Sequence, residues 1–268
     1  MIALSESPKE KKSLLDEPVS ASRLTLFHSC RLKFFFRYVE KIQKPASAAL
    51  HVGKAVHAGL QEWSKRRWMG RPCSAEEIKA DFENHWDLSQ AEEPVEFEEG
   101  EEVIQRDKAW GLVEMYLCET PVPPDEKPEA VEVGVEADLS SHGLPTLRGF
   151  IDLVRPGGVI VDFKTTAQTP NPEQVLHKNE TQLTAYGLLY REATGSREQG
   201  FELHHLIKTK APKLLITYHK PVTQQQETKL FRSIESYMDG VEREDFVPSP
   251  GLQCVACEFF NECRGAGA

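Results

Sequence analysis

Alternating apolar and polar residues predict a β-sheet in the second half of the chain. Val131, Val133 and Val135 alternate with Glu132 and Glu136, and this period of two is typical of a half-buried strand. Two further apolar runs flank the tripeptide Pro-Gly-Gly at 156–158, which predicts a tight hairpin. The strands that we expect lie at 129–139, 147–154, 159–164, 201–209 and 214–219.

Apolar residues at helical spacing predict helices on both sides of this region. An apolar stripe that includes Leu60 and Trp63 indicates a helix over 53–69. After a loop, Asn179 is expected to begin another helix, with Gln182 three residues later in a capping-box-like position and Gly195 at the end. Helical spacing also occurs at 23–42, with an interruption near 28–30, and at 75–88, 101–118 and 223–241.

The order of these elements predicts an α/β fold. A proline-rich break at 121–128 separates a helical half from a mixed half. The polar, proline-containing residues 1–19 are expected to be a disordered leader. We therefore divide the chain into this leader, a helical part at 20–128 with Cys30 and His57, a sheet with its helix at 129–222, and a cysteine-containing segment at 223–268, with 20–268 expected to form one compact unit.

Charge and hydropathy narrow the range of functions. The net charge of −10 over 268 residues argues against a protein that coats nucleic acid generally, although it leaves room for a local basic groove. Apolar runs are too short for a membrane span, and the first twelve residues lack the apolar core of a signal peptide. A cytoplasmic location and no membrane partner are the default expectations, and the sequence is silent on oligomeric state.

The hairpin at 149–166 carries the first candidate site. Asp162 and Lys164 are two apart on a strand and share a face, and Asp152 lies across the hairpin. Two carboxylates form an oxygen-rich site that suits Mg²⁺ or Mn²⁺, and a neighbouring ammonium can orient water or stabilise charge on a phosphate. The alternative is a surface ion pair without chemistry.

Cysteines near both ends of the chain form the second candidate site. Cys254, Cys257 and Cys263 lie within ten residues, and Cys30 is the candidate for a fourth ligand. A single C-x2-C is consistent with a zinc half-site or a redox pair, whereas four thiolates suit zinc or an iron–sulfur cluster. Structural disulfides are not expected because the chain shows no export signal.

Basic residues near aromatic ones suggest contacts with a nucleic-acid backbone. Arg31 and Lys33 stand beside the three phenylalanines at 34–36, and Lys208 and Lys210 lie at a predicted turn. The alternative for the aromatics is an ordinary amphipathic helix with its rings in the core. Likewise, Gln182 and Tyr186 share a helix face, which is also explained by a cap and a core aromatic.

In their order along the chain, these motifs resemble the RecB-type nucleases of the PD-(D/E)xK superfamily over residues 20–263. The acid at 162 is aspartate where glutamate is often found, and it remains a hard ligand. The cysteines resemble the one-plus-three arrangement of branch members with a [4Fe-4S] cluster, such as nucleases of CRISPR spacer acquisition and AddB-type subunits. The matching motifs are Gly53-x3-His57, Gly149-x2-Asp152, Asp162-Phe163-Lys164, Gln182-x3-Tyr186 and the cysteines 30, 254, 257 and 263.

The resemblance implies a restriction-endonuclease-like fold, with a central mixed sheet flanked by helices, and a function. It implies an Mg²⁺- or Mn²⁺-dependent DNA exonuclease that hydrolyses phosphodiester bonds in single-stranded or end-containing DNA. The pathway implied is repair, recombination, phage DNA processing or CRISPR adaptation, with a possible helicase or integrase partner. A non-catalytic DNA-binding or assembly module with a structural metal cluster is the alternative, and zinc is the alternative at the cysteines. The implied metal ligands are His57, Asp152, Asp162 and the carbonyl of Phe163, and the implied catalytic residues are Asp152, Asp162, Lys164, Gln182 and Tyr186.

Overall fold

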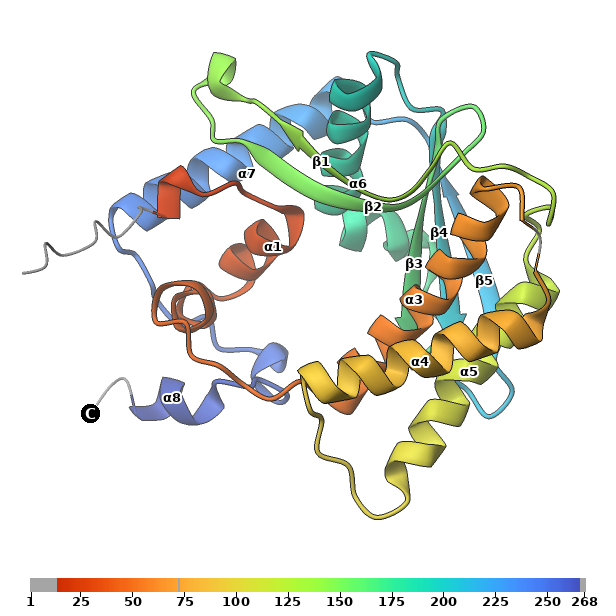
Figure 1. Ribbon diagram of the computed structural model, residues 1–268. Coiled ribbons are helices and arrows are strands. Elements are labelled where there is room, and N and C mark those ends of the chain that lie inside the picture. Colours follow the sequence, from red (N-terminus) through yellow and green to blue (C-terminus); the bar gives the residue numbers. More distant parts are fainter. Residues whose placement is uncertain (1–13, 72, 266–268) are drawn as a thin grey trace, which may run out of the picture. The chain divides into compact units, whose positions relative to one another are not determined.

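The computed structural model describes residues 14–71 and 73–265, which group into two compact units (Figure 1). The sheet unit comprises residues 43–137 and 149–230, and the terminal unit comprises residues 14–42, 138–148 and 231–265. This grouping differs from the predicted segments, because the helices at 48–119 group with the sheet and not with the N-terminal helices. No helix within the described ranges combines the length and apolar character that crossing a membrane requires.

Five strands form one mixed sheet in the order β1-β2-β3-β4-β5. β2 and β3 form the predicted antiparallel hairpin, β3 and β4 are parallel, and β4 and β5 are antiparallel. β4 is buried along its whole length, as expected of a strand with neighbours on both edges and helices on its faces. The strands are β1 (Ala130–Ala137), β2 (Leu147–Arg155), β3 (Val159–Thr166), β4 (Gly200–Ile207) and β5 (Lys213–His219), which confirms the predicted strands.

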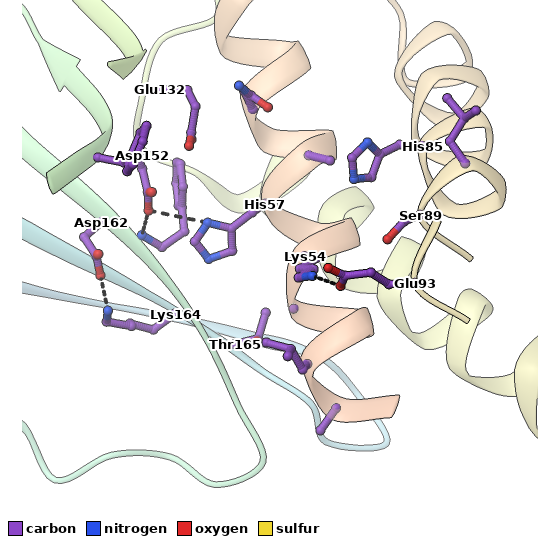
Figure 2. Close-up of a pocket in the computed structure, with 18 of the residues that line it drawn as sticks. Lys54, His57, His85, Ser89, Glu93, Glu132, Asp152, Asp162, Lys164 and Thr165 are labelled. Atoms are coloured by element: carbon purple, nitrogen blue, oxygen red, sulfur yellow. Dashed lines mark hydrogen bonds and ion pairs between the residues drawn. The ribbon is translucent and has the colours of Figure 1, made fainter. Parts of the chain in front are cut away.

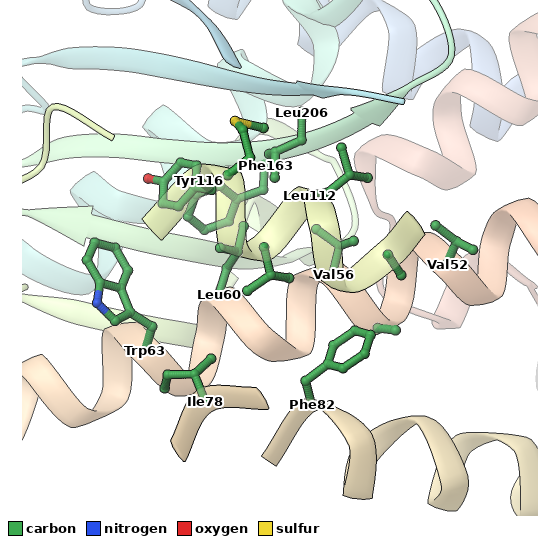
Figure 3. Close-up of a cluster of buried hydrophobic side chains, with 14 of the residues drawn as sticks. Val52, Val56, Leu60, Trp63, Ile78, Phe82, Leu112, Tyr116, Phe163 and Leu206 are labelled. Carbon is green, nitrogen blue, oxygen red and sulfur yellow. The ribbon is translucent and has the colours of Figure 1, made fainter. Parts of the chain in front are cut away.

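Three helices share one apolar cluster on one side of this sheet, where α3 and α5 pack against the strands and α4 packs against α3 and α5 (Figure 3). These are α3 (Ala48–Trp68), α4 (Ala75–Glu92) and α5 (Glu101–Glu119), as the periodicity predicts. Val161 and Phe163 of β3 point into this cluster, beside Tyr116 of α5. Because side chains alternate along a strand, Asp162 and Lys164 point to the opposite side, toward α6 (Pro172–Thr194).

The start of α6 corrects the sequence prediction. The helix begins at Pro172, with Asn171 as its N-cap, and not at Asn179. Proline at the first helical position and an asparagine before it are a standard start signal. The Asn179 side chain instead donates back to the Val175 carbonyl. Gln182 is therefore an interior helical residue, free to point its amide into the site.

Gly149 lets α6 approach the sheet closely. A Cβ at this position would lie 2.6 Å from Leu189 Cδ1 and 3.5 Å from Tyr186 Cε1. Any larger residue would push α6 away from β2. The glycine of Gly149-x2-Asp152 thus contributes to the site indirectly. It sets the distance between the sheet and α6, the helix that carries Gln182 and Tyr186.

The terminal unit contains short helical segments around aromatic residues. These are η1 (Leu14–Asp16), α1 (Ala21–Ser29), α2 (Arg31–Phe34), the π-helix η2 (Phe35–Val39), η3 (Ser140–His142), the C-terminal part of α7 (Gln224–Glu242), η4 (Leu252–Cys254) and α8 (Phe260–Gly265). The rings of Phe27, Phe34 and Tyr237 meet edge to face at 5.2–5.7 Å. Phe34 and Phe36 are buried, which favours the core interpretation of these aromatics over base stacking.

The predicted disordered leader is wrong for residues 14–19. Val19 is fully buried. Its backbone N–H donates a hydrogen bond to the Thr146 carbonyl, and its own carbonyl accepts one from the Arg148 N–H. Glu17 accepts from the buried guanidinium of Arg23 at 2.9 Å. These pairings satisfy the backbone and charged groups that disorder would have left to water. The rest of the predicted leader, residues 1–13, lies outside the described residues.

His205 makes the sheet unit sensitive to acid. Its imidazole is 3% exposed, and neither ring nitrogen has a hydrogen-bond partner within the described ranges. Burial, with the positive charge of Lys164 next in importance, lowers the pKa of His205 to about 4. An unfolded histidine binds its proton near pH 6.5, so between pH 6.5 and 4 the unfolded chain holds a proton that the folded protein does not. Stability therefore falls as the pH is lowered through this window.

We expect His205→Phe to remove this part of the acid sensitivity. Urea unfolding should be measured at pH 7 and at pH 5. Between these two values the free energy of unfolding of the parent should fall by about 2 kcal/mol more than that of the variant. The matched control is His177→Gln, at an exposed position of α6, which should behave as the parent. Equal pH dependence in the parent and His205→Phe would contradict the burial argument.

Candidate active site

One cavity collects every residue predicted for the first site (Figure 2). Its volume is about 880 Å³, and its walls come from α3, α4, β1, β2, β3 and α6. The seven predicted residues that line it are His57, Asp152, Asp162, Phe163, Lys164, Gln182 and Tyr186. Residues separated by more than a hundred positions in the sequence thus meet within a single unit.

Asp162, Lys164 and Gln182 form a closed ring of polar contacts. Lys164 Nζ lies 2.8 Å from Asp162 Oδ2 and donates to Gln182 Oε1 at 2.7 Å. Gln182 Nε2 lies 2.8 Å from both Asp162 Oδ1 and the Tyr186 hydroxyl. The amide of Gln182 therefore contacts the cation with its oxygen and the carboxylate with its nitrogen, which holds the two charges at a fixed spacing.

Asp152 links this ring to α3. Its Oδ2 accepts the Phe163 backbone N–H at 2.9 Å and lies 3.5 Å from His57 Nδ1. Burial alone would lower the pKa of His57, but the hydrogen bond and negative charge of Asp152 outweigh it and raise the pKa. The imidazole is thus drawn toward its charged form by the carboxylate beside it.

Burial acts strongly on the acids of the site. Asp162 is 2% exposed, and burial raises its pKa, an effect that Lys164 opposes and Asp152 reinforces. Burial, together with the negative charges of Asp162 and Asp152, also raises the pKa of Tyr186, so this side chain remains a neutral hydroxyl. The cavity therefore concentrates negative charge in a place where water compensates it poorly.

The donor set fits a hard divalent cation in its chemistry. Asp162 Oδ2 is buried and accepts no hydrogen bond of regular geometry, although Lys164 Nζ is close to it. Carboxylates such as those of Asp152 and Asp162 are the ligands that suit Mg²⁺ and Mn²⁺. Within the described ranges, however, no three histidine, cysteine, aspartate or glutamate side chains are grouped closely enough to hold a metal ion. The side chains instead compensate one another, Asp162 with Lys164 and Asp152 with His57.

Glu132 and Phe150 also line the cavity, although neither was predicted from the sequence to belong to the site. Glu132 of β1 adds a third carboxylate, and burial followed by the charge of Asp152 raises its pKa. Its φ of 46° lies in the left-handed region, which non-glycine residues rarely adopt. Phe150 of β2 exposes 57% of its surface in the same cavity. The available signal for Phe150 was its position two residues before Asp152, which places both on one strand face.

The predicted basic residues fall into two groups. Lys208 and Lys210 line a second cavity of about 760 Å³ in the sheet unit, together with Lys108 of α5, which was not predicted. Arg31 and Lys33 belong to the terminal unit, where Asp245 and Glu258 pair with them. The charges of Arg31 and Lys33 are therefore already partly compensated within the protein.

All four predicted cysteines line one cavity of about 320 Å³ in the terminal unit. Turns with backbone bonds from Cys254 to Gly251 and from Cys257 to Cys254 curl this segment around the cavity. Burial, followed by the charges of the other three thiols, raises the pKa of Cys263. Thiolates suit zinc or iron–sulfur ligation, yet these thiols are not close enough together to count as a metal-binding group. The structure thus brings the four cysteines to one cavity, but their sulfur atoms are not arranged as the ligands of a metal site.

Comparisons with known proteins address the fold and the family. A solved structure described as a putative exonuclease from Eubacterium rectale has a TM-score of 0.63 and 16% identity, and the match covers 98% of this chain and 94% of that chain. At this identity the likeness shows the fold alone. The structure of SSO0001 matches with a TM-score of 0.35 and 12% identity over 90% of this chain and 94% of that one. No curated protein matches the chain.

The family comparison agrees with the fold. The mixed five-stranded sheet flanked by helices is consistent with a restriction-endonuclease-like fold. The model of the PD-(D/E)XK nuclease superfamily matches residues 18–264, nearly the whole chain, and the chain therefore belongs to that superfamily.

Proposed function

We propose that this nuclease is an Mg²⁺- or Mn²⁺-dependent DNA exonuclease that hydrolyses phosphodiester bonds in single-stranded DNA or at DNA ends. The observation that carries the proposal is the convergence of Asp152, Asp162 and Lys164 in one cavity with His57 and Gln182. Burying Asp162 beside Lys164 costs desolvation free energy even though the two charges pair. Family membership makes nucleic-acid cleavage the use that best explains this cost.

The residues of the cavity divide the work by their chemistry. His57, Asp152, Asp162 and the carbonyl of Phe163 would hold the cation, which when bound supplies an activated water and polarises the scissile phosphate. Lys164, held by Gln182, stabilises the negative charge that develops on the phosphate. Tyr186 keeps its proton, and its hydroxyl accepts a hydrogen bond from Gln182 Nε2. The leaving group is the 3′-oxygen, so the product carries a 5′-phosphate.

We further propose that the four-cysteine cavity holds a [4Fe-4S] cluster, with Zn²⁺ as the alternative, which would place the chain in the RecB-like branch. Support comes from the shared cavity of Cys30, Cys254, Cys257 and Cys263. Its role would be structural, because it joins segments from both ends of the chain. Repair, recombination, phage DNA processing and CRISPR adaptation are the candidate pathways. The sequence lacks G-x4-G-K-[ST], so unwinding would need a helicase partner, and an integrase is the other candidate.

A non-catalytic DNA-binding or assembly module is the second candidate. It is favoured by the mutual compensation of Asp162 and Lys164, which gives the cavity a stable arrangement without a cation. The two functions differ in what Lys164 contributes, since a binding module has no developing charge to stabilise.

The test is a cleavage assay on end-labelled single- and double-stranded DNA with Mn²⁺, Mg²⁺ or EDTA, comparing the parent with Lys164→Ala. We expect metal-dependent degradation that falls by about 10²–10³-fold in the variant, with DNA binding retained. The product ladder reports polarity and separates exonuclease from endonuclease action. Binding without cleavage in the parent, after purification without oxygen, would favour the module.

A further inference from the structure

Phe150 stands out among the residues that line the catalytic cavity. The residue is 57% exposed, although burial of a phenylalanine is favourable. Leu50 of α3 and Leu88 of α4 line the same cavity and are 52% and 63% exposed. A single exposed apolar side chain needs no explanation, but three around one charged cavity form an apolar lining that a ligand can cover.

The strand fixes where this ring lies relative to the reacting groups. Phe150 and Asp152 are two residues apart on β2, so their side chains leave the same face at Cα positions about 7 Å apart. A phosphate held at Lys164 and at the cation proposed on Asp152 and Asp162 therefore has an aromatic face within reach of the next base of the strand. No charged group is needed at Phe150 for such a contact, because every base offers a π-face.

β1 has a gap shaped for this ring. Gly134 lies beneath it, and a Cβ there would come within 2.9 Å of Phe150 Cε1 and 3.3 Å of Cδ1. A side chain at 134 would therefore displace the ring. The glycine lets the phenyl group lie against the strand and keep one side open to the cavity.

We propose that Phe150 stacks on an unpaired base of the DNA strand that is being cleaved, which makes single-stranded DNA the preferred substrate of this site. The inference rests on the proposed function and adds to it that the DNA is unpaired where it enters the site. A base inside a duplex has both faces covered by its neighbours, so the ring can act only where a strand is single or frayed. Phe150 is thus a substrate-binding residue next to the catalytic groups.

The test measures binding separately from cleavage. In an Asp162→Asn background, fluorescence anisotropy compares a labelled oligothymidylate with the same strand carrying abasic residues. We expect Phe150→Ala to weaken binding of the base-bearing strand about 5- to 150-fold and to leave the abasic strand and a blunt duplex unchanged. Gly134→Ala moves the ring without removing it, and it should weaken binding of the base-bearing strand to a smaller extent. Tyr218→Ala, an exposed aromatic of β5 outside the cavity, is the matched control and should bind as the parent.

A second readout detects the contact directly. Phe150→Trp should show quenched tryptophan fluorescence when the oligothymidylate is added, and Tyr218→Trp should not. Equal affinity of Phe150→Ala and its parent for the base-bearing strand would overturn the stacking proposal while leaving the nuclease intact. A parent that neither binds nor cleaves DNA would overturn both.

Discussion

Asp162→Asn is expected to abolish cleavage and to leave the fold at least as stable as the parent. The carboxylate is 2% exposed, and burial raises its pKa, so its ionisation at neutral pH costs folding free energy. Asparagine removes that charge with almost no change of shape. It also removes a carboxylate that the proposed cation needs, so cleavage should fall by at least about 10²–10³-fold.

Activity and urea unfolding at pH 7 should be measured on the same preparations. Asp125→Asn, at an exposed turn position outside the cavity, is the matched control and should leave both quantities unchanged. A variant that loses activity only because it unfolds would show a lower urea midpoint. That result would contradict the view that this carboxylate is retained for chemistry at the expense of stability.

Replacing Cys254 and Cys257 by serine is expected to remove the proposed metal from the terminal unit and to unfold much of that unit. Serine oxygens are poor substitutes for thiolates toward iron or zinc. A bound structural metal contributes its binding free energy to folding, so the loss should exceed about 4 kcal/mol. Elemental analysis and the optical spectrum of protein purified without oxygen give the metal. Hydrogen exchange at residues 250–265 gives the local stability.

Cys73→Ser and Cys118→Ser provide the control, because neither residue lines the four-cysteine cavity. Both variants should keep the metal and the exchange protection. Zinc in place of iron would select the alternative metal. Full metal content in the double serine variant would contradict ligation by these cysteines.

The sequence was informative wherever local pattern decides the structure. The period-two alternation around Glu132 and the Pro-Gly-Gly turn at 156–158 predicted β1 and the hairpin, and the spacing around Asp162 placed the acid and the lysine on one face. The resemblance added His57 and Gln182, which local pattern alone would have left as ordinary helical residues. The structure brings both of them into the cavity.

The remaining features depend on contacts between distant segments. Phenylalanine is usually a core residue, so its type does not predict that Phe150 is exposed. Only the structure shows that its ring lies over Gly134 with its other side open to the cavity. The positive φ of Glu132 has no sequence signal, since glycine or asparagine would be the usual choice there. The grouping of helices 48–119 with the sheet depends on which apolar faces meet, as in the cluster around Phe163. Periodicity shows that a face is apolar but not what covers it.

The terminal unit is assembled from segments that leave the ribosome at very different times. Cys30 precedes Cys254 by 224 residues, which corresponds to about 10–45 s of synthesis at 5–20 residues per second. The residues of the sheet unit are complete at residue 230, before any of the last three cysteines has been made. The four-cysteine cavity can therefore close only after residue 263 has been synthesised. During that interval Cys30 lacks its three partner cysteines, so a metal shared by all four thiols can bind only after the last of them has been made.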